Sequence, residues 1–240
     1  MQPTPSSAPI VGAAAPPHAW YRQIVIRIRA HHVLKAIGTT AYMSIFFIAY
    51  FHLMKNPSAA VTVMPVTIID QLVTFQAWAL IPYVTLWIYV SLPAALILDR
   101  RELIGYGGWI AGLCVAGLTC FYFWPTTVLL PVEEWSKHAS FDMLKGADAA
   151  ANACPSMHVA VAIFSTFWLN HLLRDIGAPP MVRALNWLWF IAIAYSTMAI
   201  KQHVFIDVVA GLALGLVFAL PSLRYRGRTL NARRVDQGVA

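Results

Sequence analysis

Two histidines stand at the edges of apolar segments, and each has neighbours that could support chemistry. His203 and Asp207 are four residues apart in KQHVFIDVVAG, so on a helix the imidazole and the carboxylate share one face. A carboxylate that accepts a hydrogen bond from one ring nitrogen fixes the tautomer and leaves the other nitrogen free to attack. The pair therefore predicts an oriented nucleophile or base, and a structural hydrogen bond is the plainer alternative.

The second histidine ends the segment CPSMH at 154–158, directly before another apolar run. Pro155 favours a break ahead of the helix, and Ser156 suits the N-cap position. The amides of the first turn, including those of Met157 and His158, would then form an anion site at the positive end of the helix dipole. We therefore predict a phosphate site beside the lipid, with His158 as proton donor; ordinary helix capping is the alternative.

The composition is that of a membrane protein. Of the 240 residues, 59% are hydrophobic and only 11% are charged, whereas soluble domains carry about 25% charged residues. The formal net charge of +7 could suggest nucleic acid, but so apolar a chain has few polar faces to display it. We therefore expect the basic residues to contact anionic lipid, with the bilayer and not nucleic acid as partner.

Six apolar segments are candidates to cross a bilayer, which takes about 20 residues. They are Ala36–Met54, Leu72–Leu98, Leu103–Trp124, His158–Leu173, Ala184–Ile200 and Gln202–Leu223. Pro82 and Pro93 are expected to break the second. The pattern predicts an all-α integral membrane bundle of six transmembrane helices over residues 34–223. A disordered tail and basic pre-helix segment over 1–33 precede it, and a basic cytoplasmic tail over 224–240 follows.

The basic residues predict the orientation. Thirteen of the 17 lysines and arginines fall on one side of the predicted membrane. The other side receives Lys55, Lys137, Lys145 and Lys201. Because basic loops stay in the cytoplasm, both termini are predicted to be cytoplasmic, in what we expect to be a bacterial inner membrane. The loop 125–157 and the Lys201–Gln202 connection then bring both histidines to the outer face.

Cysteines and metals are expected to contribute little. Cys114, Cys120 and Cys154 form neither a disulfide framework nor a zinc-like spacing, although a bridge between Cys120 and Cys154 stays open. Two histidines and one carboxylate could bind a metal, but we predict neither a metal nor a cofactor.

At these residues the sequence resembles the type 2 phosphatidic acid phosphatase superfamily. Its members are integral membrane enzymes that act on lipid phosphates, with relatives that transfer phospho-headgroups onto sphingolipids. The second block of the family pattern reads Pro-Ser-Gly-His, and residues 155–158 read PSMH. The third block reads Ser-Arg, five residues, His, three residues, Asp, and is matched by Ser196, Thr197, His203 and Asp207. The resemblance covers roughly residues 103–220.

The resemblance also implies roles. In that family the third-block histidine attacks phosphorus and forms a phosphohistidine, the second-block histidine protonates the leaving alkoxide, and the aspartate orients the nucleophile. These roles would fall to His203, His158 and Asp207, with no metal, since phosphoryl transfer depends mainly on positioning and charge stabilisation.

Three departures from the family pattern concern the phosphate clamp. The second-block glycine is Met157, which still offers a backbone amide, and the third-block arginine is Thr197. The first block, Lys, six residues, Arg-Pro, is absent from FYFWPTTVLLPVEEW. Because lysine does not reproduce the bidentate grip of arginine on phosphate, another cation is needed. Lys201 is the lysine closest to His203 in sequence and is the first candidate. Ser196 and Thr197, with Ser156 and Met157 above, complete the predicted substrate-binding residues.

The main hypothesis is a membrane lipid-phosphate phosphatase that hydrolyses a phosphomonoester or diphosphate lipid through a phosphohistidine at the outer face. The departures also resemble the divergent branch containing inositol phosphorylceramide synthases, so a phospho-headgroup transferase with a lipid alcohol as acceptor is the alternative. A non-catalytic lipid-binding membrane subunit is the second alternative. The sequence does not indicate an oligomeric state.

Overall fold

The computed structural model describes residues 19–129, 131–142 and 152–236. Residues 1–18 of the predicted tail, Lys145 of the predicted outer loop and residues 237–240 lie outside these ranges. The helices are α1 (Ala19–Arg29), α2 (His32–Lys55), α3 (Ile68–Leu72), α4 (Leu80–Tyr89), α5 (Leu92–Leu96), α6 (Arg100–Phe123), α7 (Val132–Ser136), α9 (Met157–Asp175), α10 (Pro180–Ala199) and α11 (Phe205–Asp236), with short 3₁₀ turns η1 (Ala77–Ala79) and η2 (Ala139–Phe141). Only β1 (Thr62–Val63) and β2 (Thr126–Thr127) are strands in the described residues. The predicted all-α membrane fold is confirmed.

Three helices in the described part of the chain are long and apolar enough to cross a membrane, namely α2, α6 and the Phe205–Gly227 part of α11. Helices α9 and α10 are 19 and 20 residues long. Most side chains of α9 are buried inside the bundle, which is why this helix can carry polar residues such as Asn170 among its apolar ones. The count of six spans stays a prediction.

The second predicted span, Leu72–Leu98, is divided more finely than the sequence suggested. It contains η1, α4 and α5, and the break falls at Val90 and Ser91, ahead of Pro93 in the first turn of α5. Pro82 does not interrupt a helix, because it lies in the first turn of α4, where a missing backbone N–H costs nothing.

Both ends of the predicted membrane domain are more helical than expected. The basic pre-helix segment contains α1, and α11 continues past Leu223 to Asp236. Arg226 accounts for part of this extension, because its guanidinium donates to Glu102 of α6 at 2.7 Å and to Asp175 of α9 at 2.5 Å. The basic segment after residue 223 therefore begins as a docked helix.

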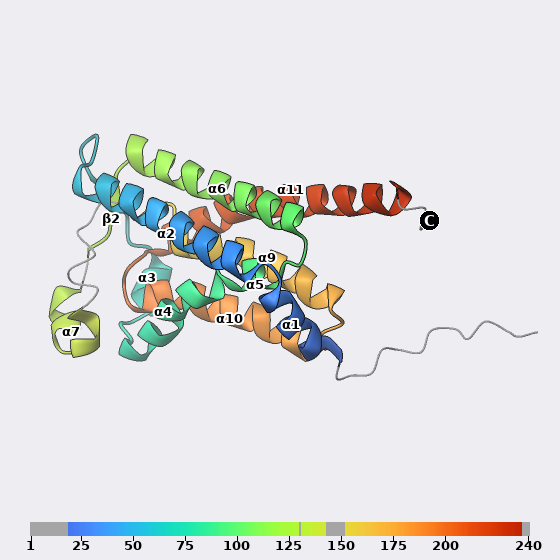
Figure 1. The fold of residues 1–240 in the computed structure, drawn as a ribbon. Coiled ribbons are helices and arrows are strands. Elements are labelled where there is room, and N and C mark those ends of the chain that lie inside the picture. Colours follow the sequence, from blue (N-terminus) through green and yellow to red (C-terminus); the bar gives the residue numbers. More distant parts are fainter. Residues whose placement is uncertain (1–18, 130, 143–151, 237–240) are drawn as a thin grey trace, which may run out of the picture.

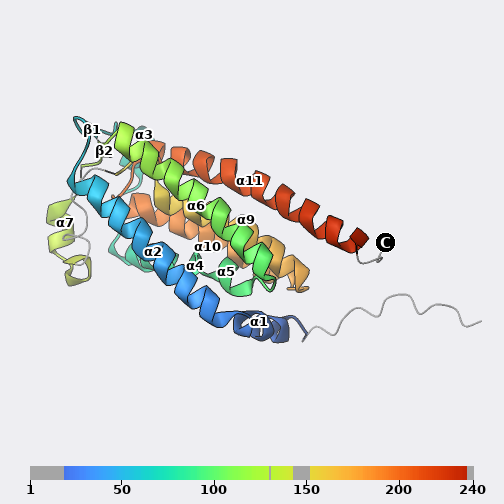
Figure 2. The same cartoon turned by 45° about the horizontal axis from the view of Figure 1, so that its top comes forward.

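Helix α9 runs through the bundle and contacts α4, α5, α6, α10 and α11. Figure 1 shows α1 and the C-terminal end of α11 at one end of the bundle, and α3, α7 and β2 at the other. Figure 2 shows the same separation from a second direction, with β1 beside β2. The first and last helices thus end at the same end of the bundle.

Two glycines of α11 allow this helix to approach the start of α9 closely. A Cβ at Gly211 would overlap the carbonyl oxygen of Ser156, and a Cβ at Gly215 would overlap that of Ala160. The contact is therefore backbone to backbone, which no other residue type permits. It fixes the position of the start of α9, which carries His158, along the axis of α11, which follows His203.

Candidate active site

The N-terminus of α9 is capped as its sequence predicts. Ser156 is fully buried, and its hydroxyl oxygen accepts a hydrogen bond from the Val159 amide at 3.4 Å. The Ser156 amide in turn donates to the carbonyl oxygen of Asp207 at 3.0 Å. One backbone hydrogen bond therefore joins the two predicted motifs directly. The first-turn amides of Met157 and His158 lie at the end of the helix where intrahelical acceptors are missing.

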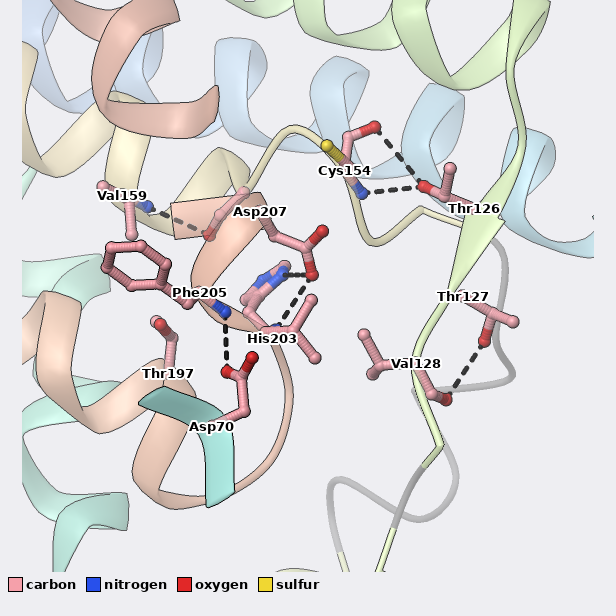
Figure 3. Close-up of polar contacts among 12 residues, drawn as sticks. Asp70, Thr126, Thr127, Val128, Cys154, Val159, Thr197, His203, Phe205 and Asp207 are labelled. Carbon is pink, nitrogen blue, oxygen red and sulfur yellow. Dashed lines mark hydrogen bonds and ion pairs between the residues drawn. The ribbon is translucent and has the colours of Figure 1, made fainter. Parts of the chain in front are cut away.

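The segment before Ser156 is held by β2. The Cys154 amide donates to the Thr126 hydroxyl at 2.7 Å, and the Ala153 amide donates to the Thr126 carbonyl at 3.0 Å. Figure 3 shows Cys154 and Thr126 facing each other beside the start of α11. The Asn152 side chain adds a bond to the carbonyl of Tyr50 on α2 at 2.9 Å. The approach to His158 is therefore anchored from outside its own helix.

The loop that carries His203 has a hydrogen bond for every backbone amide from 200 to 205. The acceptors are Ser196 O for Ile200, Met198 O for Lys201, Thr197 O for Gln202 and His203, an Asp207 carboxylate oxygen for Val204 and an Asp70 carboxylate oxygen for Phe205. Lys201 makes the tight turn with φ of 63°, in the left-handed region that a lysine rarely adopts. A loop this fully bonded holds its histidine in one place.

His203 and Asp207 face each other as their spacing predicts. The Nδ1 atom of His203 lies 3.6 Å from Oδ2 of Asp207, and the two side chains are 5% and 0% exposed. This distance is longer than a hydrogen bond, although catalytic contacts often tighten only when substrate binds. Figure 3 shows the carboxylate above the imidazole, beside the first turn of α11. The arrangement leaves Nε2 of His203 as the atom available to attack.

The structure brings His158 and His203 together. Their ring centroids are 5.6 Å apart, with an angle of 61° between the ring planes. Tyr83 stacks on His158 at 4.6 Å, and Trp87 meets it edge-on at 5.7 Å. The Nε2 atom of His158 and the Nδ1 atom of His203 are buried without a hydrogen-bond partner. Buried polar atoms rarely lack a partner, and a catalytic role is one of the recognised reasons.

An apolar cavity of about 230 Å³ opens beside His158. Aromatic side chains of α2 form one wall, and α4, α6 and α9 form the others. Its lining includes Phe46, Phe47, Tyr50, Phe51, Tyr83, Trp87, Met157 and His158. Met157, where the family pattern has glycine, sends its thioether against Gly117 of α6, where a Cβ would overlap it. The bulk of Met157 is therefore taken up by the wall of the cavity.

The other predicted substrate-binding side chains are engaged elsewhere. The hydroxyls of Ser196 and Thr197 donate to the carbonyls of Ile193 and Ala194 in their own helix, at 2.6 and 2.8 Å. The Lys201 ammonium donates to the carbonyl of Asp70 at 2.9 Å and to that of Val73. The structure therefore places these three residues around the His203 loop, but it does not direct their polar hydrogens at the two imidazoles.

Asp70 is the residue that sequence reasoning missed. It is 6% exposed, and its carboxylate caps the Phe205 amide at 2.7 Å although it lies 135 residues away. The pattern from Thr67 to Asp70 is a capping box, which could have revealed the start of α3. No signal in the sequence links α3 to α11.

The described residues show neither a grouping of metal ligands nor a disulfide bond. No group of three or more His, Cys, Asp or Glu side chains there is arranged to hold a metal ion. All three cysteines are free, with Cys114 and Cys154 buried and Cys120 exposed.

Comparison with known proteins gives one match. Searches of curated proteins and of solved structures found no significant match. The model of the PAP2 superfamily matches residues 114–230, a stretch that contains the capped start of α9, both imidazoles and the Asp207 carboxylate. Over this stretch the chain is similar to the PAP2 superfamily, whose members are generally phosphatases and phosphotransferases.

Proposed function

We propose that this protein is a membrane phosphatase that hydrolyses a lipid phosphomonoester or diphosphate through a phosphohistidine. The observation that supports this most directly is the pair of buried imidazoles 5.6 Å apart, one of which faces a buried carboxylate. A single phosphoryl group between the two rings would meet a nucleophile on one side and a proton donor on the other. Similarity to the PAP2 superfamily supports the same general type of activity.

In the first step, Nε2 of His203 attacks phosphorus, and the bond between phosphorus and the ester or bridging oxygen breaks. Protonated His158 donates its proton to the departing oxygen, so the lipid leaves as an alcohol or, from a diphosphate, as a monophosphate. Asp207 faces Nδ1 of His203 and stabilises the positive charge that develops on the ring.

In the second step, neutral His158 takes a proton from water, and the oxygen of that water attacks the phosphohistidine. The bond between phosphorus and Nε2 breaks and releases inorganic phosphate. The amides at the start of α9 are the proposed groups that stabilise charge on the phosphoryl oxygens. The Lys201 ammonium would add to them only by turning from its carbonyl partners on Asp70 and Val73.

The cavity supports a lipid as the leaving group. It opens on the side of His158, which is the side of the proton donor and therefore of the departing oxygen. A hydrocarbon chain in this cavity would be attached to that oxygen, and the aromatic walls of α2 would shield it from water.

The absence of a guanidinium favours the transferase as second candidate. All arginines fall on the predicted cytoplasmic side, and Thr197 stands where the family pattern has arginine. A phosphodiester carries one negative charge where a phosphomonoester carries up to two, so it needs less cationic support. In a transferase the same phosphohistidine would react with a lipid alcohol instead of water.

The test uses purified protein in lipid nanodiscs with phosphatidic acid, a sphingoid-base phosphate, an isoprenyl phosphate and an isoprenyl diphosphate. We expect release of inorganic phosphate from at least one of them, and none above background from the His203→Ala variant. Phosphodiester donors with ceramide or diacylglycerol as acceptor form the second arm. Headgroup transfer with negligible phosphate release would replace the phosphatase by the transferase, and no turnover in either arm would favour a non-catalytic subunit.

Lys201 gives a pH dependence with a defined sign. Burial lowers the pKa of Lys201, and the nearby Asp70 carboxylate opposes part of that shift. The ammonium therefore loses its proton at a lower pH than an exposed lysine does. If it stabilises the phosphoryl charge, kcat/KM falls as pH rises through this lowered pKa.

We expect Lys201→Arg to move the alkaline fall of kcat/KM to higher pH, because a guanidinium stays protonated. We expect Lys201→Met to remove this fall and to have a lower kcat/KM than wild type at pH values below the lysine pKa. Lys137→Met is the matched control, since Lys137 is exposed and paired with Glu134, and it should leave the profile unchanged. An alkaline limb that is identical in wild type and Lys201→Met would exclude Lys201 from the site.

A further inference from the structure

Asp70 stands at a junction between α3 and the His203 loop. One carboxylate oxygen accepts from the Phe205 amide at 2.7 Å, and the other accepts from the amide and hydroxyl of Thr67 at 2.8 and 2.7 Å. Its own carbonyl accepts from the Lys201 ammonium at 2.9 Å. Figure 3 shows the Asp70 carboxylate directly below Phe205, with His203 on the adjoining turn. The carboxylate thus accepts from two amides and one hydroxyl.

The bond to Phe205 replaces a partner that α11 cannot provide. Phe205 is the first residue of α11, so its amide has no acceptor within the helix. A carboxylate at this position both accepts that hydrogen and interacts favourably with the helix dipole. In most helices the cap comes from the preceding residue, whereas here it comes from a separate helix far away in the sequence.

The cap bears on the nucleophile because His203 lies two residues before Phe205. The His203 amide is held by Thr197 of α10, and the Val204 amide is held by Asp207 of α11. Asp70 holds the next amide, that of Phe205. Of these three acceptors, it alone comes from neither α10 nor α11. Without it, the first turn of α11 is free to fray, and the imidazole that follows this turn loses its fixed distance to His158.

We propose that Asp70 is a positioning residue for the reaction. It fixes the start of α11 and thereby keeps Nε2 of His203 in line with a phosphorus atom beside His158. This inference rests on the proposed function and adds to it a residue that lies outside the segment matched by the family model.

The test compares Asp70→Ala, Asp70→Asn and Thr67→Ala. Thr67→Ala removes one partner of Asp70 but keeps the bond to Phe205, so we expect kcat to match wild type. Asp70→Ala removes the cap, and we expect kcat to fall by about 10²-fold, since a displacement of roughly 1 Å has effects of this size, while KM stays near the wild-type value. Asp70→Asn keeps an acceptor oxygen for Phe205, and we expect it to recover most of the lost kcat.

The measurement is kcat and KM for the best substrate of the lipid panel, per folded molecule. Thermal melting sets a temperature at which every variant is folded. A purely structural role predicts that kcat per folded molecule is unchanged in Asp70→Ala, and that result would overturn the proposal. If Asp70→Ala does not fold, the decision passes to Thr67→Ala and Asp70→Asn, which both keep an acceptor for the Phe205 amide, and a kcat about 10²-fold below wild type in Thr67→Ala would also overturn the proposal.

The design separates this inference from the proposed function. A wild-type protein that releases no phosphate, or His203→Ala that releases as much as wild type, contradicts the function itself. An active wild type with an inactive His203→Ala and a fully active Asp70→Ala contradicts only the role of Asp70.

Discussion

Replacing His203 with alanine is expected to lower phosphate release by about 10⁴-fold or more, the scale on which loss of a nucleophile acts. No other described side chain occupies its position between Asp207 and His158. The variant should also fail to incorporate ³²P from a labelled lipid phosphate, because the covalent intermediate forms on its Nε2 atom. Quenching in detergent at alkaline pH, followed by gel analysis with and without an acid treatment, measures this, since a phosphohistidine survives in base and is lost in acid.

The matched control for His203→Ala is His171→Ala. His171 lies on α9 and its ring nitrogen bonds to the Phe167 carbonyl of the same helix at 2.9 Å, away from the paired imidazoles. We expect it to retain wild-type phosphate release and labelling. Label that persists in His203→Ala would show that another group is the nucleophile.

The second large effect is expected for His158→Ala, and it should depend on the leaving group. Loss of a general acid costs about 10²–10⁴-fold, and we expect a loss in this range for lipid alkyl phosphates, whose alkoxide must be protonated. An aryl phosphate leaves as a stable phenolate and needs less help, so the ratio of wild-type to variant rates should shrink for p-nitrophenyl phosphate. The comparison of these two substrates is the measurement.

Equal losses for alkyl and aryl phosphates would rule out acid catalysis by His158 and leave it a role in binding or as the base of the second step. Tyr83→Leu is a useful companion, because Tyr83 stacks on the His158 ring without being a proton donor to the substrate in the proposed scheme. We expect it to weaken the dependence on the leaving group without removing it.

The parts of the site that could be predicted from the sequence depend on local geometry. The four-residue spacing of His203 and Asp207 places both on one helical face, and a serine ahead of an apolar run predicts a capped helix. These patterns work because the partners lie within one turn. The apolar segments that became α2 and α6 were predictable for a similar reason, since length and hydropathy are properties of a single segment.

The parts that could not be predicted depend on contacts across the fold. Asp70 gives no sign in the sequence that it caps a helix starting at Phe205, because only the packing of α3 against the α10–α11 loop creates that contact. The same packing draws the Lys201 ammonium to carbonyls of α3. The continuation of α11 beyond Leu223 depends on the two carboxylates that Arg226 reaches on α6 and α9.

The cavity beside His158 implies that the two products part in opposite directions. Under the proposed function, a released lipid alcohol would have its chain among α2, α4 and α6 and could move sideways into the hydrocarbon of the bilayer. Inorganic phosphate has no such path and must depart into water. Turnover then never exposes the chain to water, which would cost about 25 cal/mol for each Å² of apolar surface, and we expect the thickness and fluidity of the surrounding lipid to affect how quickly the alcohol departs.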